Sequence, residues 1–496
     1  MHGPEKSDRP VVPANPPNKV GSPAAEAGEG SGLGKENAAS KTRPGHRAGQ
    51  GATSALDRVR RVARQDKDVR FTALLHHVDV DRLREAFWAL NPKASAGVDG
   101  VTWRDYEEDL EANLQDLHGR VHRGAYRARP SQRVYIPKAD GRQRPLGVAA
   151  LEDKLLQRAV VEVLGAVYEQ DFLGLSYGFR PGRSPHRALD ALAAGISWRK
   201  VNWVLDADIR GFYDSIDHGW MLKFLEHRIA DQRILRLIGK WLKAGVIEDG
   251  EWSETLEGAA QGASVSPLLS NVYLHYVFDL WADLYRRRRA RGEMIIVRFA
   301  DDYIVGFQYR DDAERFLAAL RDRLAKFSLE LAPEKTRLIE FGRFAAQNRA
   351  ARGLGKPETF QFLGFTHVCG KTRNGRFQLQ RITEAKRLRA KLHKLKGELR
   401  RRMHLPIPDQ GLWLGQVVQG HINYYAVPGN IKAIRTYRDQ AIRHWHTALR
   451  RRSQRTSLDW EQMGGLAQRW LPPAKIIHPW PDARFDARIR ARSPVS

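Results

Sequence analysis

From about Tyr135 to Phe365, the chain alternates short runs of β-branched and aromatic residues with longer segments of helical periodicity. The runs that predict strands are "RVYIPK", "NWVLDADI", "MIIVRFA", "YIVGFQ" and "FQFLGFTHV". Such alternation is typical of α/β or α+β domains. A helical pattern begins near Leu56, and "DRLREAFWALNPKASAGVDG" (81–100) predicts an amphipathic helix that ends in a glycine-rich loop.

The pattern changes after Gln380. Leucines at 388, 392, 395 and 399 recur at spacings of four, three and four, which predicts one apolar helix face with lysine and arginine on the other faces. Residues 381–452 hold 17 Lys+Arg against 4 Asp+Glu, so half of the net charge of +26 lies there. A charge run is usually a solvated helix face, but so large and local a surplus favours phosphate binding.

The bulk composition narrows the class of protein. A chain of 496 residues has room for about three domains, and 42% hydrophobic residues suffice for sizeable cores. The net charge of +26 favours a nucleic-acid partner over a merely basic protein or one attracted to anionic membrane. The single cysteine, Cys369, excludes disulfides within the chain and cysteine-based zinc sites.

The N-terminal residues and the lengths of the apolar runs lead to expectations about order and location. Residues 1–50 are rich in glycine, proline, alanine and charge, so we expect a disordered tail. The opening "MHGPEKSDRP" lacks the apolar core of a signal peptide. No apolar run approaches the ~18 residues that a membrane span needs. We therefore expect a cytoplasmic protein without membrane contact, in the cytosol or nucleoid if it is bacterial.

Two adjacent aspartates interrupt the apolar run "IIVRFADDYIVGF" (295–307). Two residues between such strands fit a tight hairpin, but Asp-Asp suits its positive backbone angles poorly. Asp206 and Asp208 end another apolar run, and carboxylates beside buried strands are costly unless paired or bound to cations. If both strands share a sheet, Asp208, Asp301 and Asp302 could converge on two Mg²⁺ ions and support nucleotidyl transfer. The alternative is an exposed Asp-Asp turn and an unrelated aspartate.

Seven sequence blocks occur in one order along the chain. They are "VYIPKADGRQRPLGV", "SYGFRPGRSPHRAL", "LDADIRGFYDSIDH", "GAAQGASVSPLLSNVYL", "VRFADDYIVGF", "LAPEKTRLIEF" and "FLGF". This series resembles the reverse transcriptases encoded by group II introns, over about residues 80–450. The resemblance implies an α+β right-hand polymerase, with fingers and a palm of antiparallel sheet and helices, followed by an all-helical thumb or maturase domain.

The resemblance also implies domain boundaries. After the tail come an N-terminal fingers extension at 51–116, fingers and palm at 117–367, and a thumb or maturase domain at 368–455. Residues 456–496 would form a basic C-terminal tail that could bind DNA. Some members of the family end in a zinc-dependent endonuclease with cysteine pairs, which this chain lacks beyond Cys369.

The catalytic assignment follows the palm motifs. The resemblance makes Asp208, Asp301 and Asp302 the catalytic and metal-binding residues, with two Mg²⁺ ions as cofactor. Asp206, Asp214 and Asp217 are interpreted as structural. The family usually has tyrosine where this chain has Phe299, and we expect activity to survive that change because the carboxylates are intact.

Four residues are expected to bind the incoming nucleotide. Lys138 and Arg144 flank "ADGRQ" and would grip the triphosphate. Tyr213 would lie under the sugar and exclude a 2′-hydroxyl, and Gln261 would contact template or nucleotide. For Lys138 and Arg144, the alternative is that they are exposed cations on a polar turn. For Tyr213, the alternative is a core aromatic, which is also the role expected for the neighbouring Phe212.

Six residues are expected to contact nucleic acid: Arg180, Arg183, Gly262, Lys335, Phe362 and Gly364. The arginines would bind template or primer backbone, and glycine would let the backbone approach the base pair. Lys335 would lie near the leaving pyrophosphate, although a surface ammonium is the default. The "FLGF" strand pair would support the primer terminus, and a plain buried strand explains it equally well. Tyr424 and Tyr425 fit core aromatics better than base-stacking residues.

The resemblance implies an RNA-directed DNA polymerase that extends a DNA primer on template RNA with dNTPs. It also implies a maturase that binds group II intron RNA and assists splicing and mobility, without an obligate protein partner. Two alternatives remain open. One is an RNA-binding splicing cofactor with an idle polymerase site, and the other is a host-domesticated reverse transcriptase in defence or repair.

Overall fold

The computed structural model describes residues 50–137, 143–255, 257–452 and 458–484. The predicted disordered tail lies outside the described residues, except for Gln50. Within the described part of the chain, no helix is long and apolar enough to cross a membrane.

The N-terminal part is a cluster of helices around α5 (Leu151–Asp171), whose buried face includes twelve residues. Helices α1 (Gln50–Gln65) and α2 (Val80–Ala89) pack on it, α4 (Leu110–His122) packs on α2, and α3 (Trp103–Glu108) packs on α4. Leu83, Ala86 and Phe87 of α2 are fully buried, which confirms the predicted amphipathic helix. Asp79 caps its N-terminus by accepting a hydrogen bond from the Arg82 amide.

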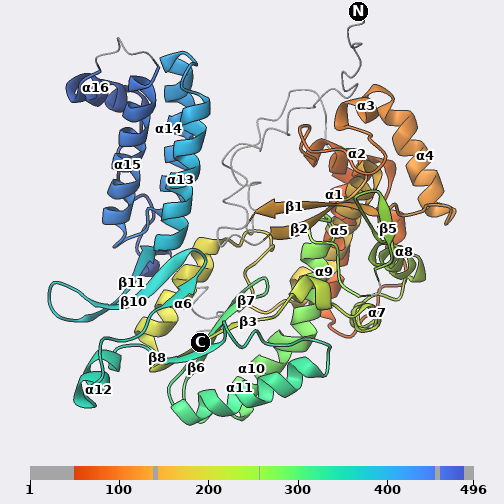
Figure 1. The fold of residues 1–496 in the computed structure, drawn as a ribbon. Coiled ribbons are helices and arrows are strands. Elements are labelled where there is room, and N and C mark those ends of the chain that lie inside the picture. The colour runs from red at the N-terminus through yellow and green to blue at the C-terminus, as the bar shows by residue number, and fades with distance from the viewer. Residues whose placement is uncertain (1–49, 138–142, 256, 453–457, 485–496) are drawn as a thin grey trace, which may run out of the picture.

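A four-stranded sheet in the order β2-β1-β4-β5 extends from this cluster. Its strands are β1 (Ser131–Pro137), β2 (Gln143–Val148), β4 (Val246–Glu248) and β5 (Glu251–Ser253). The long β1–β2 hairpin points toward the C-terminal helices across the molecule (Figure 1). The adjoining helices are α7 (His218–Glu226), α8 (Gln232–Leu242) and α9 (Ser266–Leu274).

The central sheet has the antiparallel order β6-β7-β3-β8. Its strands are β3 (Trp203–Asp208), β6 (Met294–Phe299), β7 (Asp302–Phe307) and β8 (Arg337–Glu340). Alternate residues face two separate cores, one shared with α10 (Leu280–Arg288) and α11 (Arg310–Ala325) and the other with α6 (Pro185–Trp198). Figure 1 shows α10 and α11 below this sheet and α6 above it. The predicted α+β architecture is therefore present.

The C-terminal part begins with strands, so the expected all-helical domain from residue 368 is wrong at its start. Strand β10 (Phe365–Lys371) pairs with β9 (Phe360–Phe362) and β11 (Phe377–Thr383). The period-two pattern of "FQLQRIT" and the positive φ of +74° at Gly375 favour this hairpin. Helices follow only from Ala385: α13 (Ala385–Arg401), α14 (Ile407–Tyr425) and α15 (Ile431–Arg450).

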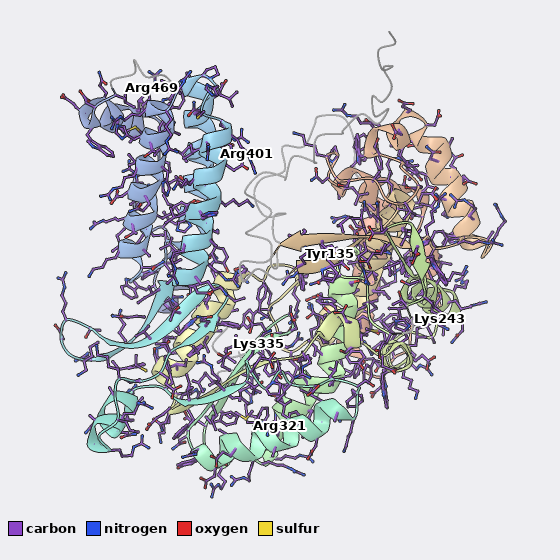
Figure 2. All side chains as sticks on the ribbon, viewed as in Figure 1. Tyr135, Lys243, Arg321, Lys335, Arg401 and Arg469 are labelled. Atoms are coloured by element: carbon purple, nitrogen blue, oxygen red, sulfur yellow. The ribbon has the colours of Figure 1, made fainter. Side chains whose placement is uncertain are left out.

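Part of the expected C-terminal tail is also folded. Helix α16 (Trp460–Trp470) packs on α14 and α15, and its face of Met463, Ala467 and Leu471 is buried at a spacing of four. The short helix α17 (Pro481–Arg484) then lies against α6. A remaining helix, α12 (Ala345–Ala351), lies between β8 and β9. The bundle of α13–α16 stands opposite the β1–β2 hairpin, with Arg401 and Arg469 on it and Tyr135 on the hairpin (Figure 2).

Candidate active site

The β6–β7 hairpin turns at Ala300-Asp301, one residue earlier than the predicted Asp-Asp turn. Asp302 is already in β7 and pairs with Phe299. Ala300 has φ of +56°, a left-handed conformation that costs a residue with a Cβ roughly 1–2 kcal/mol. Asp301 therefore lies at the tip of the turn, while Asp302 is fixed by the strand ladder.

Asp208 and Asp302 are direct partners across β3 and β7. Direct partners project from the same face of a sheet, with Cβ atoms roughly 4.5–5.5 Å apart. Asp206 lies two residues earlier on the same face of β3. The expected meeting of Asp208 with the hairpin that carries Asp301 and Asp302 is thus present at one end of the central sheet.

This end of the sheet concentrates negative charge in a partly buried place. Burial raises the pKa of Asp302 well above its ordinary value, and the charges of Asp206, Asp301 and Asp208 add to the rise. Burial also raises the pKa of Asp301. The pKa of Asp206 rises to about 6 through burial, despite an ion pair with Arg337 at 3.1 Å. Such a cluster is stabilised when a cation binds beside it.

A lysine ammonium occupies part of that place. Lys335, which follows the "APE" of the sixth sequence block, forms an ion pair with the carboxylate of Asp208. Among the described residues, no group of three or more His, Cys, Asp or Glu side chains is arranged to hold a metal ion by itself. Mg²⁺ in phosphoryl-transfer sites uses one or two carboxylates together with water and substrate phosphate oxygens. The donor chemistry of Asp208, Asp301 and Asp302 fits that requirement, with Lys335 as the cation now present.

Two predicted nucleotide-binding residues lie near the same turn. The charge of Arg144, on β2, lowers the pKa of Asp301, although burial prevails. Burial, followed by the charge of Asp301, raises the pKa of Tyr213 to about 12. Tyr213 is partly exposed on the short 3-10 helix Phe212–Ser215, whereas Phe212 is buried in the core as expected. Lys138 lies outside the described residues.

The loop before α9 lies against β2. Gly147 donates its amide hydrogen to the carbonyl of Gln261 at 2.7 Å. Gly262 has φ of +113°, and a Cβ there would come within 2.9 Å of the Gly147 carbonyl oxygen. Glycine is therefore required for this close approach. Gln261 is partly exposed and lines a cavity of about 460 Å³ beside β2.

Arg180 is not available to nucleic acid, which corrects the sequence-based prediction. Its side chain is 4% exposed and forms an ion pair with Glu169 at 3.0 Å. Its guanidinium also donates to the carbonyls of Leu173 and Ser176 at 2.7 and 2.9 Å. Arg183 is partly exposed and donates to the Gly174 carbonyl at 2.8 Å. Both arginines stabilise the conformation of the "SYGFRPGR" loop through these hydrogen bonds.

The "FLGF" segment is the β9–β10 turn and is attached to the helical bundle. Phe362 is 1% exposed, so its ring belongs to the core and does not reach a primer. Leu363 and Gly364 have φ of +49° and +76°, which suits a two-residue hairpin. Tyr424 donates to the Leu363 carbonyl at 2.9 Å, and a Cβ at Gly364 would lie 3.0 Å from the Tyr425 hydroxyl. The turn therefore contacts α13 and α14 of the helical bundle, while Phe362 is part of the core.

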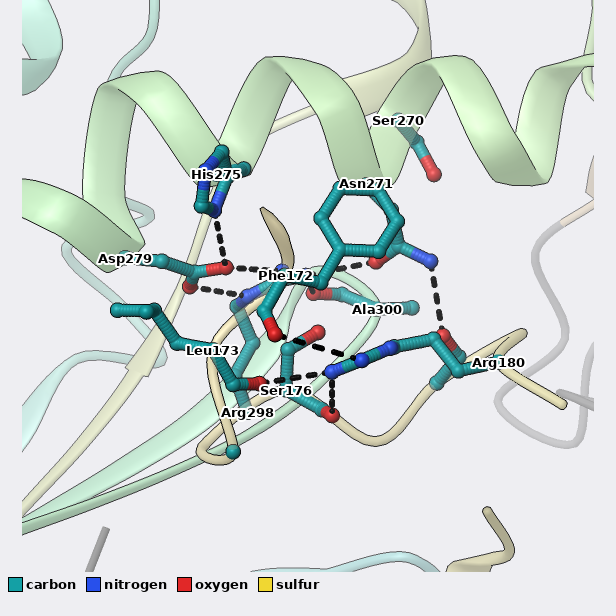
Figure 3. Close-up of polar contacts among 12 residues, drawn as sticks. Phe172, Leu173, Ser176, Arg180, Ser270, Asn271, His275, Asp279, Arg298 and Ala300 are labelled. Atoms are coloured by element: carbon teal, nitrogen blue, oxygen red, sulfur yellow. Dashed lines mark hydrogen bonds and ion pairs between the residues drawn. The ribbon is translucent and has the colours of Figure 1, made fainter. Parts of the chain in front are cut away.

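A buried polar network beside the Ala300–Asp301 turn was not anticipated from the sequence (Figure 3). Arg298, fully buried in β6, binds Asp279 through two hydrogen bonds of 2.7 and 2.6 Å. It also donates to the Asn271 side chain at 3.1 Å and to the Ala300 carbonyl at 2.8 Å. The available signal was an arginine inside the otherwise apolar run "IIVRFA", where an unpaired charge would be very costly.

Comparison with known proteins agrees with this architecture. Residues 136–367 match the family described as reverse transcriptase (RNA-dependent DNA polymerase). Over 200 residues the chain is 37% identical to protein YkfC of Escherichia coli (strain K12), covering 40% of this chain and 52% of that protein. Over 222 residues it is 33% identical to the group II intron-encoded protein LtrA of Lactococcus lactis subsp. cremoris, covering 44% and 37%. An uncharacterized 91 kDa protein in the cob intron of Schizosaccharomyces pombe is 34% identical over 189 residues, covering 37% and 23%.

The fold and the carboxylate-bearing end of the central sheet thus define a reverse transcriptase domain. Residues 136–367 are similar to the reverse transcriptase family, and parts of the chain are similar to group II intron-encoded proteins. Reverse transcriptases generally use divalent metal ions. The alignments span about half of the length of YkfC and about a third of that of LtrA.

Proposed function

We propose that the protein is an RNA-directed DNA polymerase that extends a DNA primer on an RNA template with dNTPs. The observation that carries this proposal is the register of Asp208 with Asp302, next to Asp301 at the turn. Three carboxylates at one end of a palm sheet, with raised pKa values for Asp301 and Asp302, form a site that favours divalent cations. Two Mg²⁺ ions held there would stabilise the attacking and leaving oxygens of an in-line displacement.

The protein's own side chains supply orientation and charge. Asp208 and Asp301 would hold the cations, and Asp302 would support them from the first position of β7. Arg144 would bind the triphosphate of the incoming nucleotide, because its charge already acts on Asp301. Lys335 would move from Asp208 toward the leaving pyrophosphate and could donate a proton to it.

Tyr213 and Gln261 would shape the nucleotide pocket. Tyr213 is partly exposed beside Asp301, so its ring can lie under the sugar and exclude a 2′-hydroxyl. The Gln261–Gly262 loop is held against β2, which lets its backbone lie close to the nascent base pair. Together they would select deoxynucleotides and orient the template base.

The C-terminal helices would bind structured RNA, including group II intron RNA, and so act as a maturase. Residues 381–452 carry 17 Lys+Arg against 4 Asp+Glu. On α13 the leucines at 395 and 399 are buried, while Lys386, Arg389 and Arg400 are exposed. Exposed cations along a helix suit the phosphates of an RNA whose shape is recognised. The similarity to LtrA supports this role.

Primer extension on an RNA template tests the polymerase. Wild-type protein should incorporate dNTPs in Mg²⁺, and Asp301→Ala/Asp302→Ala should lose at least about 10³-fold in rate with RNA affinity nearly unchanged. Asp214→Ala, which removes an exposed carboxylate from the nearby 3-10 helix, is the matched control and should polymerise. Normal synthesis by the double variant would refute the palm assignment. A wild-type protein that binds RNA but never extends a primer would favour a splicing cofactor with an idle site.

A further inference from the structure

The catalytic turn depends on groups on the opposite face of the sheet. Asp208 and Asp302 project toward the core shared with α6, because their neighbours Val204 and Ile304 belong to that core. Arg298 pairs with Tyr303, whose side chain lies in the other core. The sheet therefore separates the Arg298 guanidinium from the carboxylates of Asp208 and Asp302.

Arg298 joins the Ala300–Asp301 turn to the helical segment that carries Asn271 and Asp279. Two of its nitrogens bind both oxygens of Asp279, and the third binds the Asn271 side chain and the Ala300 carbonyl. Arg298 and Asp279 are both fully buried, so the hydrogen bonds are not exposed to competition from water. Burial lowers the pKa of the adjacent His275 to about 4, so that ring is neutral at physiological pH and Arg298 balances the charge of Asp279.

The turn is also held from the "SYG" loop. Asn271 donates its side-chain amide to the Gly178 carbonyl at 2.8 Å. A Cβ at position 178 would clash with the backbone nitrogen of Ala300. The Tyr177 amide donates to the Arg298 carbonyl at 2.8 Å, so loop and strand are paired. The left-handed Ala300 is thus fixed by a guanidinium on its carbonyl and by Gly178 beside its nitrogen.

We propose that Arg298, with Asp279 and Asn271, is a positioning residue that holds the Ala300–Asp301 turn and thereby sets where the Asp301 carboxylate lies. The inference rests on the proposed polymerase function for its catalytic consequence. Its structural part, the rigidity of the turn, stands independently of that function. A planar guanidinium is needed because one lysine ammonium cannot make the two Asp279 bonds, the Asn271 bond and the Ala300 bond together.

The test compares two buried arginine-to-lysine changes. Arg298→Lys keeps a cation beside Asp279, which reduces the risk of unfolding that a neutral residue would bring. Arg381→Lys is the matched control, because Arg381 forms a buried ion pair with Asp190 at 2.8 Å that does not touch the turn. Asn271→Ala removes the link to Gly178 and serves as the second variant.

Hydrogen exchange of the amides at 299–302, in protein without metal ions, is the first readout. Arg298→Lys and Asn271→Ala should exchange there roughly tenfold faster or more, and Arg381→Lys should match wild type. The second readout is the Mg²⁺ concentration for half-maximal primer extension, which should rise roughly tenfold in Arg298→Lys with template–primer affinity unchanged. Unchanged exchange in Arg298→Lys, or equal acceleration in Arg381→Lys, would overturn the proposal. Absence of polymerisation by wild type would refute the polymerase function alone, because the exchange readout does not need it.

Discussion

Asp208 and Asp302 lie directly opposite each other on neighbouring antiparallel strands. This register places two carboxylates on one face of the sheet, with a third at the adjacent turn. Without a cation the arrangement is unfavourable, since burial and like charge raise the pKa of Asp302. The clustering of carboxylates that lowers stability therefore also favours the binding of cations.

Asp206 should lower stability at neutral pH. Its pKa is raised by burial from 3.8 to about 6, and its side chain is 16% exposed. The folded state thus favours the protonated acid, and stability falls as pH rises through about 4 to 6. We expect Asp206→Asn to stabilise the protein by about 1–3 kcal/mol above pH 7 and by almost nothing near pH 4. Urea unfolding at several pH values measures this, with the exposed Asp322→Asn as control. A gain that is equal at all pH values would contradict the burial explanation.

Lys335 should compete with metal ions for Asp208. An exposed ion pair contributes up to about 1 kcal/mol, so Lys335→Met should lower the half-saturating Mg²⁺ concentration by up to about fivefold. The rate at saturating Mg²⁺ should fall by about 10²-fold if the ammonium assists the leaving pyrophosphate. Lys335→Arg should keep the Mg²⁺ requirement near that of wild type. Primer extension over a range of Mg²⁺ concentrations measures both effects. If neither the half-saturating Mg²⁺ concentration nor the rate changes, Lys335 has no role in the site.

Tyr213 should control the choice of sugar. Replacing its ring by a smaller side chain, Tyr213→Val, should increase ribonucleotide incorporation relative to deoxynucleotide by about tenfold or more. Tyr213→Phe keeps the ring and should behave like wild type, because exclusion of the 2′-hydroxyl is steric. Incorporation ratios from single-nucleotide extension measure the effect. Unchanged discrimination in Tyr213→Val would assign the ring to packing.

The basic face of α13 should dominate the salt dependence of RNA binding. If about six to ten phosphates are neutralised, affinity should fall about 10³–10⁵-fold between 50 and 200 mM salt. Arg389→Gln/Arg400→Gln should reduce the slope of log affinity against log salt by about 2. The matched pair Arg321→Gln/Lys326→Gln, on exposed positions in and just after α11, should leave this slope unchanged. Equal losses in both pairs would indicate binding through overall charge.

Local patterns predicted most of the fold and the carboxylate cluster. The apolar runs that end in Asp208 and enclose Asp301 became neighbouring strands, because period-two burial fixes register. The roles of Arg180 and Phe362 were misjudged, since a motif does not reveal which way a side chain faces. Arg180 is bound by loop carbonyls, and Phe362 is in the core. Arg298 lies 19 residues from Asp279 and 27 from Asn271, and spacing along one sequence does not indicate that these side chains meet.

The most direct test of the central claim is a count of bound Mn²⁺ by electron paramagnetic resonance. The complex would contain template–primer with a terminated primer and the next dNTP. Wild type should bind about two ions at the active site, whereas Asp208→Asn and Asp301→Asn should each lose this binding. Asp217→Asn, which alters the cap of α7, is the control and should bind like wild type. Undiminished Mn²⁺ binding in Asp208→Asn and Asp301→Asn would contradict the account.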